Sequence, residues 1–120
     1  MPDSPLDAAD EPDEVLVQRA GALGRLTLNR PRAINALNHS MVRTLAAALD
    51  EWRDDDSVRT VLLSGAGDRG LCAGGDIVAI YTAVRSGRDD ALRFWADEYH
   101  LDAAIARYPK PYVALMDGLV

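Results

Sequence analysis

The segment Gly65–Ile77 (GAGDRGLCAGGDI) is the most informative part of this chain. It follows the apolar run Arg59–Ser64, which has the composition of a buried strand, and it precedes residues with helical spacing. A glycine-rich loop at the carboxyl end of a strand is where α/β proteins usually bind ligands. Five glycines within residues 65–75 let the backbone approach a ligand and point N–H groups at it. Spacing alone supports two interpretations equally, a tight turn or a loop that stabilises an oxyanion.

The composition is that of an ordinary globular protein, with 48% hydrophobic and 27% charged residues. The 120 residues are enough for one domain, and no apolar run is long enough to predict a transmembrane helix, so no membrane partner is expected. The first residues are acidic and lack the features of a signal or transit peptide, which predicts a cytoplasmic location. The single cysteine, Cys72, excludes an internal disulfide and a cysteine-based zinc cluster, and no metal site is expected.

The net charge of −6 comes from the amino-terminal tail, where residues 1–14 hold six acids and no base. The remainder carries 13 acids against 13 bases, and its arginines do not cluster, so no nucleic-acid partner is expected. We interpret residues 1–13 as a disordered acidic tail. Residues 14–120 are interpreted as the amino-terminal part of one α/β domain.

Turn signals and apolar spacing predict the element order ββ–α–β–α–α–β, an α/β pattern. The predicted strands are Glu14–Ala20, Arg25–Asn29, Arg59–Ser64 and Tyr112–Met116. A hairpin at Gly21–Gly24 joins the first two strands, and a loop at Arg30–Asn38 follows the second. The last two strands are nearly all apolar, which is typical of parallel strands covered on both faces.

Three helices are predicted from apolar residues at helical spacing. The first begins near Asn38 or Ser40, both good N-caps. Its apolar stripe consists of Met41, Leu45, Ala48, Leu49 and Trp52. The second helix carries Ile77, Ile80, Tyr81 and Val84 on one face. The third, capped by Asp89 and ended by Pro109, carries Leu92, Trp95, Ala96, Tyr99, Leu101, Ile105 and Tyr108. We assign Trp95 and Tyr99 to the core.

Other chemistry is less well supported. Gly65-x-Gly67-x-x-Gly70 matches the dinucleotide fingerprint, but the paired glycines that follow oppose the helix start which that mechanism needs. A nicotinamide oxidoreductase is therefore a distant alternative, and a P-loop is excluded because no Lys-Ser/Thr follows the glycines. We interpret Cys72 as a buried packing residue. His39 and His100 are interpreted as structural or exposed.

Three motifs in order resemble the enoyl-CoA hydratase/isomerase (crotonase) superfamily. They are Asn29–Asn38 (NRPRAINALN), Gly70–Ile77 (GLCAGGDI) and Lys110–Gly118 (KPYVALMDG). Residues 68–76, 95–101 and 108–115 together resemble one branch of it, the 3-hydroxyisobutyryl-CoA hydrolases. The resemblance covers about residues 14 to 120. It implies a crotonase-like spiral of ββα units, incomplete in this chain, in which two backbone N–H groups hold the thioester carbonyl of an acyl-CoA.

The resemblance also implies roles for individual residues. Gly75 would supply the first oxyanion N–H, and Gly74, Asp76 and Ile77 around it would contact the substrate, although Asp76 is more simply a helix cap. The CoA-binding residues would be Arg32, Ala33, Ile34 and Ala73, which fall where the family's loops meet the adenine and phosphates, partly through backbone carbonyls. Glu98 would orient the acyl hydroxyl or a water; otherwise it is a solvated helix residue.

The family's second N–H donor and the branch's catalytic carboxylates would follow Val120. We therefore expect these 120 residues to be inactive alone and to need a carboxyl-terminal segment, possibly a second chain. The expected function is hydrolysis of a short hydroxyacyl-CoA in valine breakdown. It needs no cofactor, because CoA is part of the substrate. An enoyl-CoA hydratase and a non-catalytic CoA-binding fragment remain open, as does a homo-oligomer.

Overall fold

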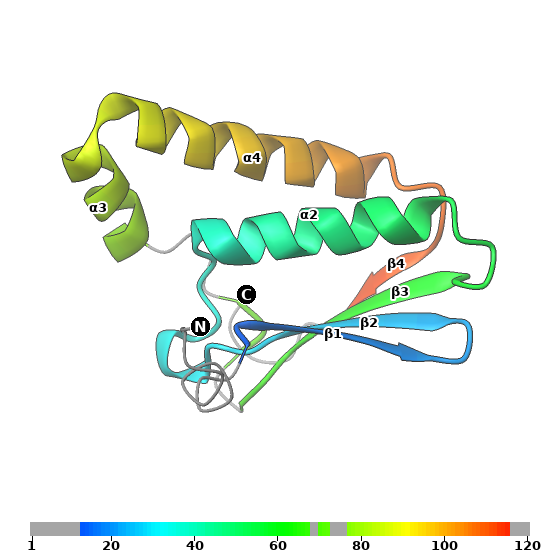
Figure 1. The fold of residues 1–120 in the computed structure, drawn as a ribbon. Coiled ribbons are helices and arrows are strands. Elements are labelled where there is room, and N and C mark those ends of the chain that lie inside the picture. Colours follow the sequence, from blue (N-terminus) through cyan, green and yellow to red (C-terminus); the bar gives the residue numbers. More distant parts are fainter. Residues whose placement is uncertain (1–12, 68–69, 73–76, 116–120) are drawn as a thin grey trace, which may run out of the picture.

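A computed structural model of the chain describes residues 13–67, 70–72 and 77–115 (Figure 1). Four strands form one mixed sheet in the order β1-β2-β3-β4. The strands are β1 (Val15–Ala20), β2 (Leu23–Leu28), β3 (Thr60–Gly65) and β4 (Tyr112–Ala114). The β1–β2 pair is antiparallel, whereas β3 is parallel to both β2 and β4. The predicted α/β class and element order are confirmed.

The hairpin turn is tighter than predicted. Ala20 pairs with Leu23, so the turn is confined to Gly21 and Ala22, with Gly21 at a φ of 63° that favours glycine. Gly24, which we placed in the turn, lies inside β2 beneath Trp52. A Cβ at Gly24 would come within 2.6 Å of the indole ring, so only glycine lets helix and sheet approach this closely.

Helix α2 (His39–Arg53) covers one face of the sheet (Figure 1). The side chain of Asn38 accepts a hydrogen bond from the backbone N–H of Met41 at 2.9 Å, which confirms Asn38 as the N-cap. The predicted apolar stripe is buried throughout, as is its partner surface on the sheet, which includes Leu26, Leu28 and Val61. At the other end of α2, Lys110 Nζ donates to the backbone carbonyls of Trp52 and Asp55 and so satisfies groups that a helix end leaves open.

Helices α3 (Ile77–Ser86) and α4 (Arg88–Ala106) follow, and α4 packs along α2 (Figure 1). The predicted break at Ser86-Gly87 is confirmed. The predicted cap is wrong, because α4 begins at Arg88 with Gly87 at the N-cap, which places Asp89 inside the first turn.

The core assignment of Trp95 and Tyr99 is also wrong. Their side chains are 46% and 70% exposed, whereas Phe94 and Leu101 are 2% and 3% exposed. Buried and half-buried residues of α4 at positions 91, 94, 98, 101 and 105 follow the spacing of one helix face. Trp95 and Tyr99 each follow a member of this stripe by one residue, which turns them about 100° around the helix.

Strands β3 and β4 are half-buried rather than covered on both faces. Only Val61 of β3 is fully buried, and Val113 of β4 is exposed. The reason is that α2 and α4 lie over the same face of the sheet, within the part of the chain that the structure describes (Figure 1). Burial against that covered face raises the pKa of Tyr112 to about 12.

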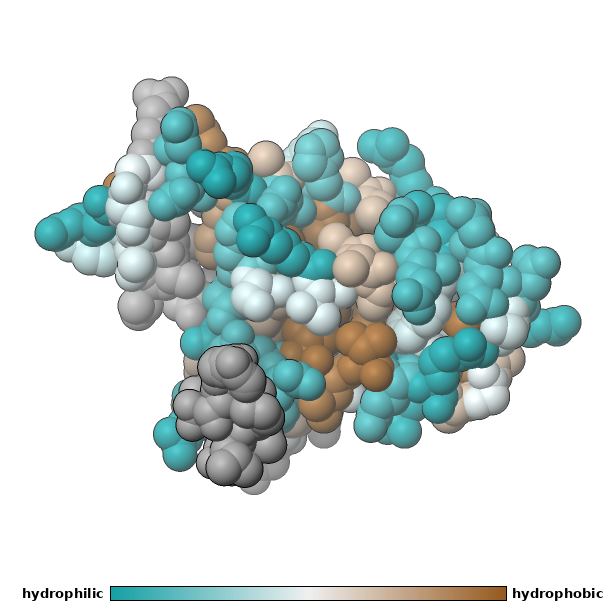
Figure 2. Space-filling view, in the orientation of Figure 1, coloured by the Kyte–Doolittle hydropathy of each residue, from teal (hydrophilic) through white to brown (hydrophobic). Residues whose placement is uncertain are grey.

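In the same orientation, hydrophilic side chains cover much of the surface, and a hydrophobic area lies between α2 and the sheet (Figure 2). The core reaches solvent along the edge strand β1, where Val17 is exposed. Among the helices described, none combines the length and the apolar character that crossing a membrane requires.

Candidate functional site

Two loops leave the carboxyl ends of the parallel strands β2 and β3, where α/β proteins usually bind ligands. The first, predicted as a plain loop at Arg30–Asn38, contains a short 3-10 helix at Pro31–Ala33. Ile34 and Asn35 follow it with φ angles of 51° and 56°. A β-branched residue in the left-handed region is rare and strained, so the surrounding structure must hold Ile34 there.

Asn35 is the residue that holds this loop. Its side chain is fully buried, accepts a hydrogen bond from the Arg30 N–H at 2.8 Å, and donates to the carbonyls of Ala66 and Gly70 at 3.0 and 3.3 Å. Its own carbonyl accepts from Cys72 Sγ at 3.2 Å. One amide therefore ties the loop after β2 to the loop after β3. Sequence reasoning quoted Asn35 within a motif but gave it no role, since its partners lie more than 30 residues away.

The glycines at the start of the second loop serve close packing against the first. A Cβ on Gly65 would lie 2.7 Å from Nδ2 of Asn35, and one on Gly67 would lie 2.8 Å from the Cβ of Pro31. Gly67 also has a φ of 86°. Cys72 is partly buried and packs against the core, as predicted. The predicted oxyanion residues Gly74, Gly75 and Asp76, with Ala73, lie outside the described residues.

The predicted CoA-binding residues lie together on the first loop. Arg32 is exposed, while Ala33 and Ile34 are half-buried. The carbonyl of Ala33 accepts a hydrogen bond from the Ala36 N–H at 3.0 Å. Among the described residues, none donates a hydrogen bond to the carbonyls of Arg32 and Ile34. Ile77 begins α3, after the second loop.

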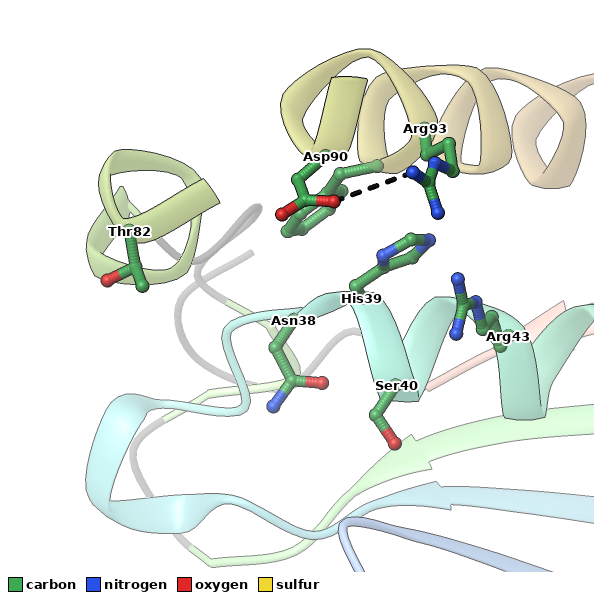
Figure 3. Close-up of a pocket in the computed structure, with 8 residues that line it drawn as sticks. Asn38, His39, Ser40, Arg43, Thr82, Asp90 and Arg93 are labelled. Atoms are coloured by element: carbon green, nitrogen blue, oxygen red, sulfur yellow. Dashed lines mark ion pairs between the residues drawn. The ribbon is translucent and has the colours of Figure 1, made fainter. Parts of the chain in front are cut away.

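A cavity of about 460 Å³ opens between the start of α2, α3 and α4 (Figure 3). Seven of its eight lining residues are of polar type; the lining comprises Asn38, His39, Ser40, Arg43, Thr82, Asp90, Arg93 and Phe94. Figure 3 shows His39 and Arg43 of α2 below the Asp90–Arg93 ion pair of α4. None of these residues was predicted to bind a ligand.

A histidine–aspartate pair lies beside this cavity. His39 Nε2 and Asp97 Oδ2 are 2.6 Å apart, and Arg43 Nε approaches the same carboxylate oxygen at 3.6 Å. The imidazole also stacks on Phe94, with 5.2 Å between ring centroids and 12° between planes. The hydrogen bond from His39, with the positive charges of His39 and Arg43, lowers the pKa of Asp97. Sequence reasoning treated His39 as structural or exposed and missed Asp97, because the two lie 58 residues apart.

Glu98 lies on α4 between the buried Phe94 and Leu101, at helical spacing from both. It is half-buried, and no hydrogen bond or ion pair joins it to any described residue, including the loop at Arg32–Ile34. Glu98 as a substrate-contacting residue and Glu98 as a solvated helix residue both stay predictions. A carboxylate at such a position is suited to meet a polar group from a ligand. His100 is exposed, as predicted.

The described residues contain no group of three His, Cys, Asp or Glu side chains placed to hold a metal ion. The polar groups that these residues offer are backbone carbonyls, the half-buried carboxylate of Glu98, and the side chains of His39, Arg43 and Arg93 at the cavity.

Comparison with known proteins gives consistent results. A family model described as enoyl-CoA hydratase/isomerase matches residues 23–120. Mitochondrial 3-hydroxyisobutyryl-CoA hydrolase from Xenopus tropicalis is 45% identical over 88% of this chain, and the human protein of that name is 39% identical over 92%. The chain spans 28% of the length of each of these relatives.

Solved structures agree with the sequence matches. A carnitinyl-CoA dehydratase from Mycobacterium thermoresistibile superposes with a TM-score of 0.87 and 60% identity, over 91% of this chain and 32% of that one. An enoyl-CoA hydratase from Rhodobacter sphaeroides gives a TM-score of 0.82 and 39% identity, over 88% and 32% of the two chains. The mixed sheet with its covering helices is therefore a crotonase fold, and the chain belongs to the enoyl-CoA hydratase/isomerase family.

Proposed function

We propose that the protein carrying this chain hydrolyses a short 3-hydroxyacyl-CoA thioester of the 3-hydroxyisobutyryl-CoA type. The observation that carries the proposal is the 45% identity, over 88% of the chain, to a relative named for that hydrolysis. In the reaction, water adds to the thioester carbonyl and the C–S bond breaks. The products are the hydroxy acid and free CoA thiol. We assign this reaction to valine breakdown.

The candidate site supports this proposal because different residues would bind CoA, stabilise the oxyanion and contact the acyl group. The backbone carbonyls of Arg32 and Ile34, which no described residue uses, would accept hydrogen bonds from the amino group of the CoA adenine. The backbone N–H of Gly75 would stabilise the tetrahedral oxyanion, as preorganised N–H donors do in acyl transfer. Glu98 would accept a hydrogen bond from the acyl hydroxyl or from the attacking water. The second oxyanion donor and the carboxylate that drives attack would come from protein beyond these 120 residues.

Hydration or dehydration of an acyl-CoA is the second candidate. It is favoured by the 60% identity to a structure described as a carnitinyl-CoA dehydratase. The two reactions share the oxyanion hole and differ in the bond that breaks. A hydratase or dehydratase changes the double bond next to the carbonyl and leaves the thioester intact.

Thiol release distinguishes the two candidates. The complete protein is incubated with 3-hydroxyisobutyryl-CoA, and free CoA is followed with a thiol-reactive dye while absorbance of the conjugated enoyl thioester is recorded in parallel. Thiol formation that depends on the protein supports the hydrolase. Enoyl absorbance without thiol supports the lyase, and tight binding of CoA without either product supports a non-catalytic CoA-binding protein.

The role of Glu98 has its own test. Glu98→Gln keeps the side-chain shape and removes the charge, so kcat/KM for the hydroxylated substrate should fall about 10- to 100-fold, the range of one charge-assisted hydrogen bond. Isobutyryl-CoA, which lacks the hydroxyl, should be affected less. His100→Gln, an exposed change on the same helix, is the matched control and should leave both rates unchanged.

A further inference from the structure

The contact between α2 and α4 has an unusual polar centre. Among the described residues, every hydrogen bond and ion pair between these two helices ends on Asp97, from His39 at 2.6 Å and Arg43 at 3.6 Å. The rest of the contact is apolar and includes Phe94 and Leu101. Apolar packing is non-directional, so it tolerates small rotations and translations of one helix along the other. A short hydrogen bond to an ionised group is directional and fixes one position.

His39 is itself held firmly. It is the first residue of α2, directly after the N-cap Asn38, whose side chain also donates to Glu14 Oε1 at 2.8 Å. The imidazole is stacked on the buried Phe94. One ring face is therefore stacked on Phe94 and Nε2 is bonded to Asp97, both from α4, in a side chain that is only partly exposed. The ring is suited to position another group.

The residue that follows Asp97 is Glu98, which has no polar partner among the described residues. Because consecutive residues of an α-helix are rigidly connected, fixing Asp97 against α2 also fixes the backbone from which the Glu98 side chain extends. Misplacing a functional group by 1 Å can cost about 100-fold in rate. The start of α2 in turn follows the loop at Arg32–Ile34 along the chain, so the His39–Asp97 contact links α4 to the helix that begins just after this loop.

We propose that His39 and Asp97 form a positioning pair that holds Glu98 in register with the CoA-binding loop, and so determines selectivity for a hydroxylated acyl group. This inference rests on the proposed role of Glu98. His39 and Asp97 do not touch the substrate in this account. They act through the placement of α4.

A double-mutant cycle tests the proposal in the complete protein. His39→Leu keeps bulk against Phe94 and removes the donor, whereas His39→Gln keeps an N–H donor near the position of Nε2. For 3-hydroxyisobutyryl-CoA we expect His39→Leu to lower kcat about tenfold with KM changed less than twofold, and His39→Gln to retain most of the activity. For isobutyryl-CoA both variants should resemble the unmodified protein. In a Glu98→Gln background, His39→Leu should cause no further loss.

The outcomes are separable. If Glu98→Gln is as active as the unmodified protein, the role of Glu98 fails and the positioning role fails with it. If Glu98→Gln is impaired but His39→Leu is not, or if the two losses multiply, only the positioning role is overturned. Equal losses on both substrates would indicate a purely structural contact and would also overturn it. If the melting temperature shows that His39→Leu does not fold, Asp97→Asn, which has an isosteric side chain, replaces it in the double-mutant cycle with Glu98→Gln. His100→Leu is the matched histidine control.

Discussion

The pair of loops after β2 and β3 and the pair of helices α2 and α4 are held together in opposite ways. In their described parts the loops meet through backbone atoms, tight glycines and one buried amide, Asn35. The helices meet through an apolar stripe with a partly exposed ion pair at one point, His39–Asp97. The contact between the loops fixes backbone positions closely but tolerates no substitution at Asn35, because no other side chain makes the same hydrogen bonds. The contact between the helices can be changed gradually, because single substitutions at its surface alter it only in part.

The largest effect that tests this contrast is expected at Asn35. Asn35→Ala removes the partners of the Arg30 N–H and of the Ala66 and Gly70 carbonyls, and we expect the free energy of unfolding to fall by about 4 kcal/mol. Chemical denaturation measures this. Asn29→Ala is the control, since its amide donates to Asp13 in an exposed position and should cost about 1 kcal/mol or less. Similar small losses at both positions would contradict the assigned role of Asn35.

The second prediction concerns which face of α4 is packed. Phe94 is 2% exposed and Trp95 is 46% exposed, so Phe94→Ala should destabilise the protein by about 3 kcal/mol. Trp95→Ala should cost about 1 kcal/mol or less, because little buried area is lost. Thermal unfolding of both variants gives the comparison. A larger loss for Trp95 than for Phe94 would mean that α4 presents the other stripe to the body of the protein.

The smallest effect is a pH dependence at the helix contact. The pKa of Asp97 lies below its ordinary value of 3.8, mainly because His39 donates a hydrogen bond to it. A depressed carboxyl pKa adds stability that is present above the unfolded pKa and is lost as the pH falls through the folded pKa. Asp97→Asn should therefore flatten the decline of stability in the region below pH 4, with little change in the shape of the curve above it.

Carboxyl carbon NMR supplies the direct check. The Asp97 resonance should titrate below the ordinary range in the unmodified protein and move back towards it in His39→Leu. An unchanged titration in that variant would assign the depression to Arg43 instead.

These regions also differ in how far the sequence predicts them. Helix α2 was predicted correctly to its cap and stripe, because Asn38 and the apolar spacing are local signals. Helix α4 carries two apolar stripes one residue apart, and local spacing cannot say which of them meets α2. The choice of the stripe with Trp95 and Tyr99 was wrong for that reason. Half-burial of β3 and β4 was missed because it depends on which faces the helices cover.

In the candidate site, too, local sequence signals predicted some residues and tertiary contacts determined the others. Arg32, Ala33 and Ile34 came from the family resemblance, and the open carbonyls beside them could not be inferred from residue types, since any residue offers a carbonyl. Glu98 could be named but not placed. The His39–Asp97 pair had no sequence signal at all, because two residues 58 positions apart become neighbours only when α4 packs on α2.

The strand order described above also has a kinetic consequence. Each strand pairs with the next strand along the chain, but only β1 and β2 are joined by a two-residue turn, so they can pair before anything else forms. β3 must wait for a crossover that contains α2, and β4 for one that contains α3 and α4, so each later addition carries a larger loop-closure entropy. We expect the sheet to grow from the hairpin outward, with amide protons of β1 and β2 protected from exchange earliest and those of β4 last.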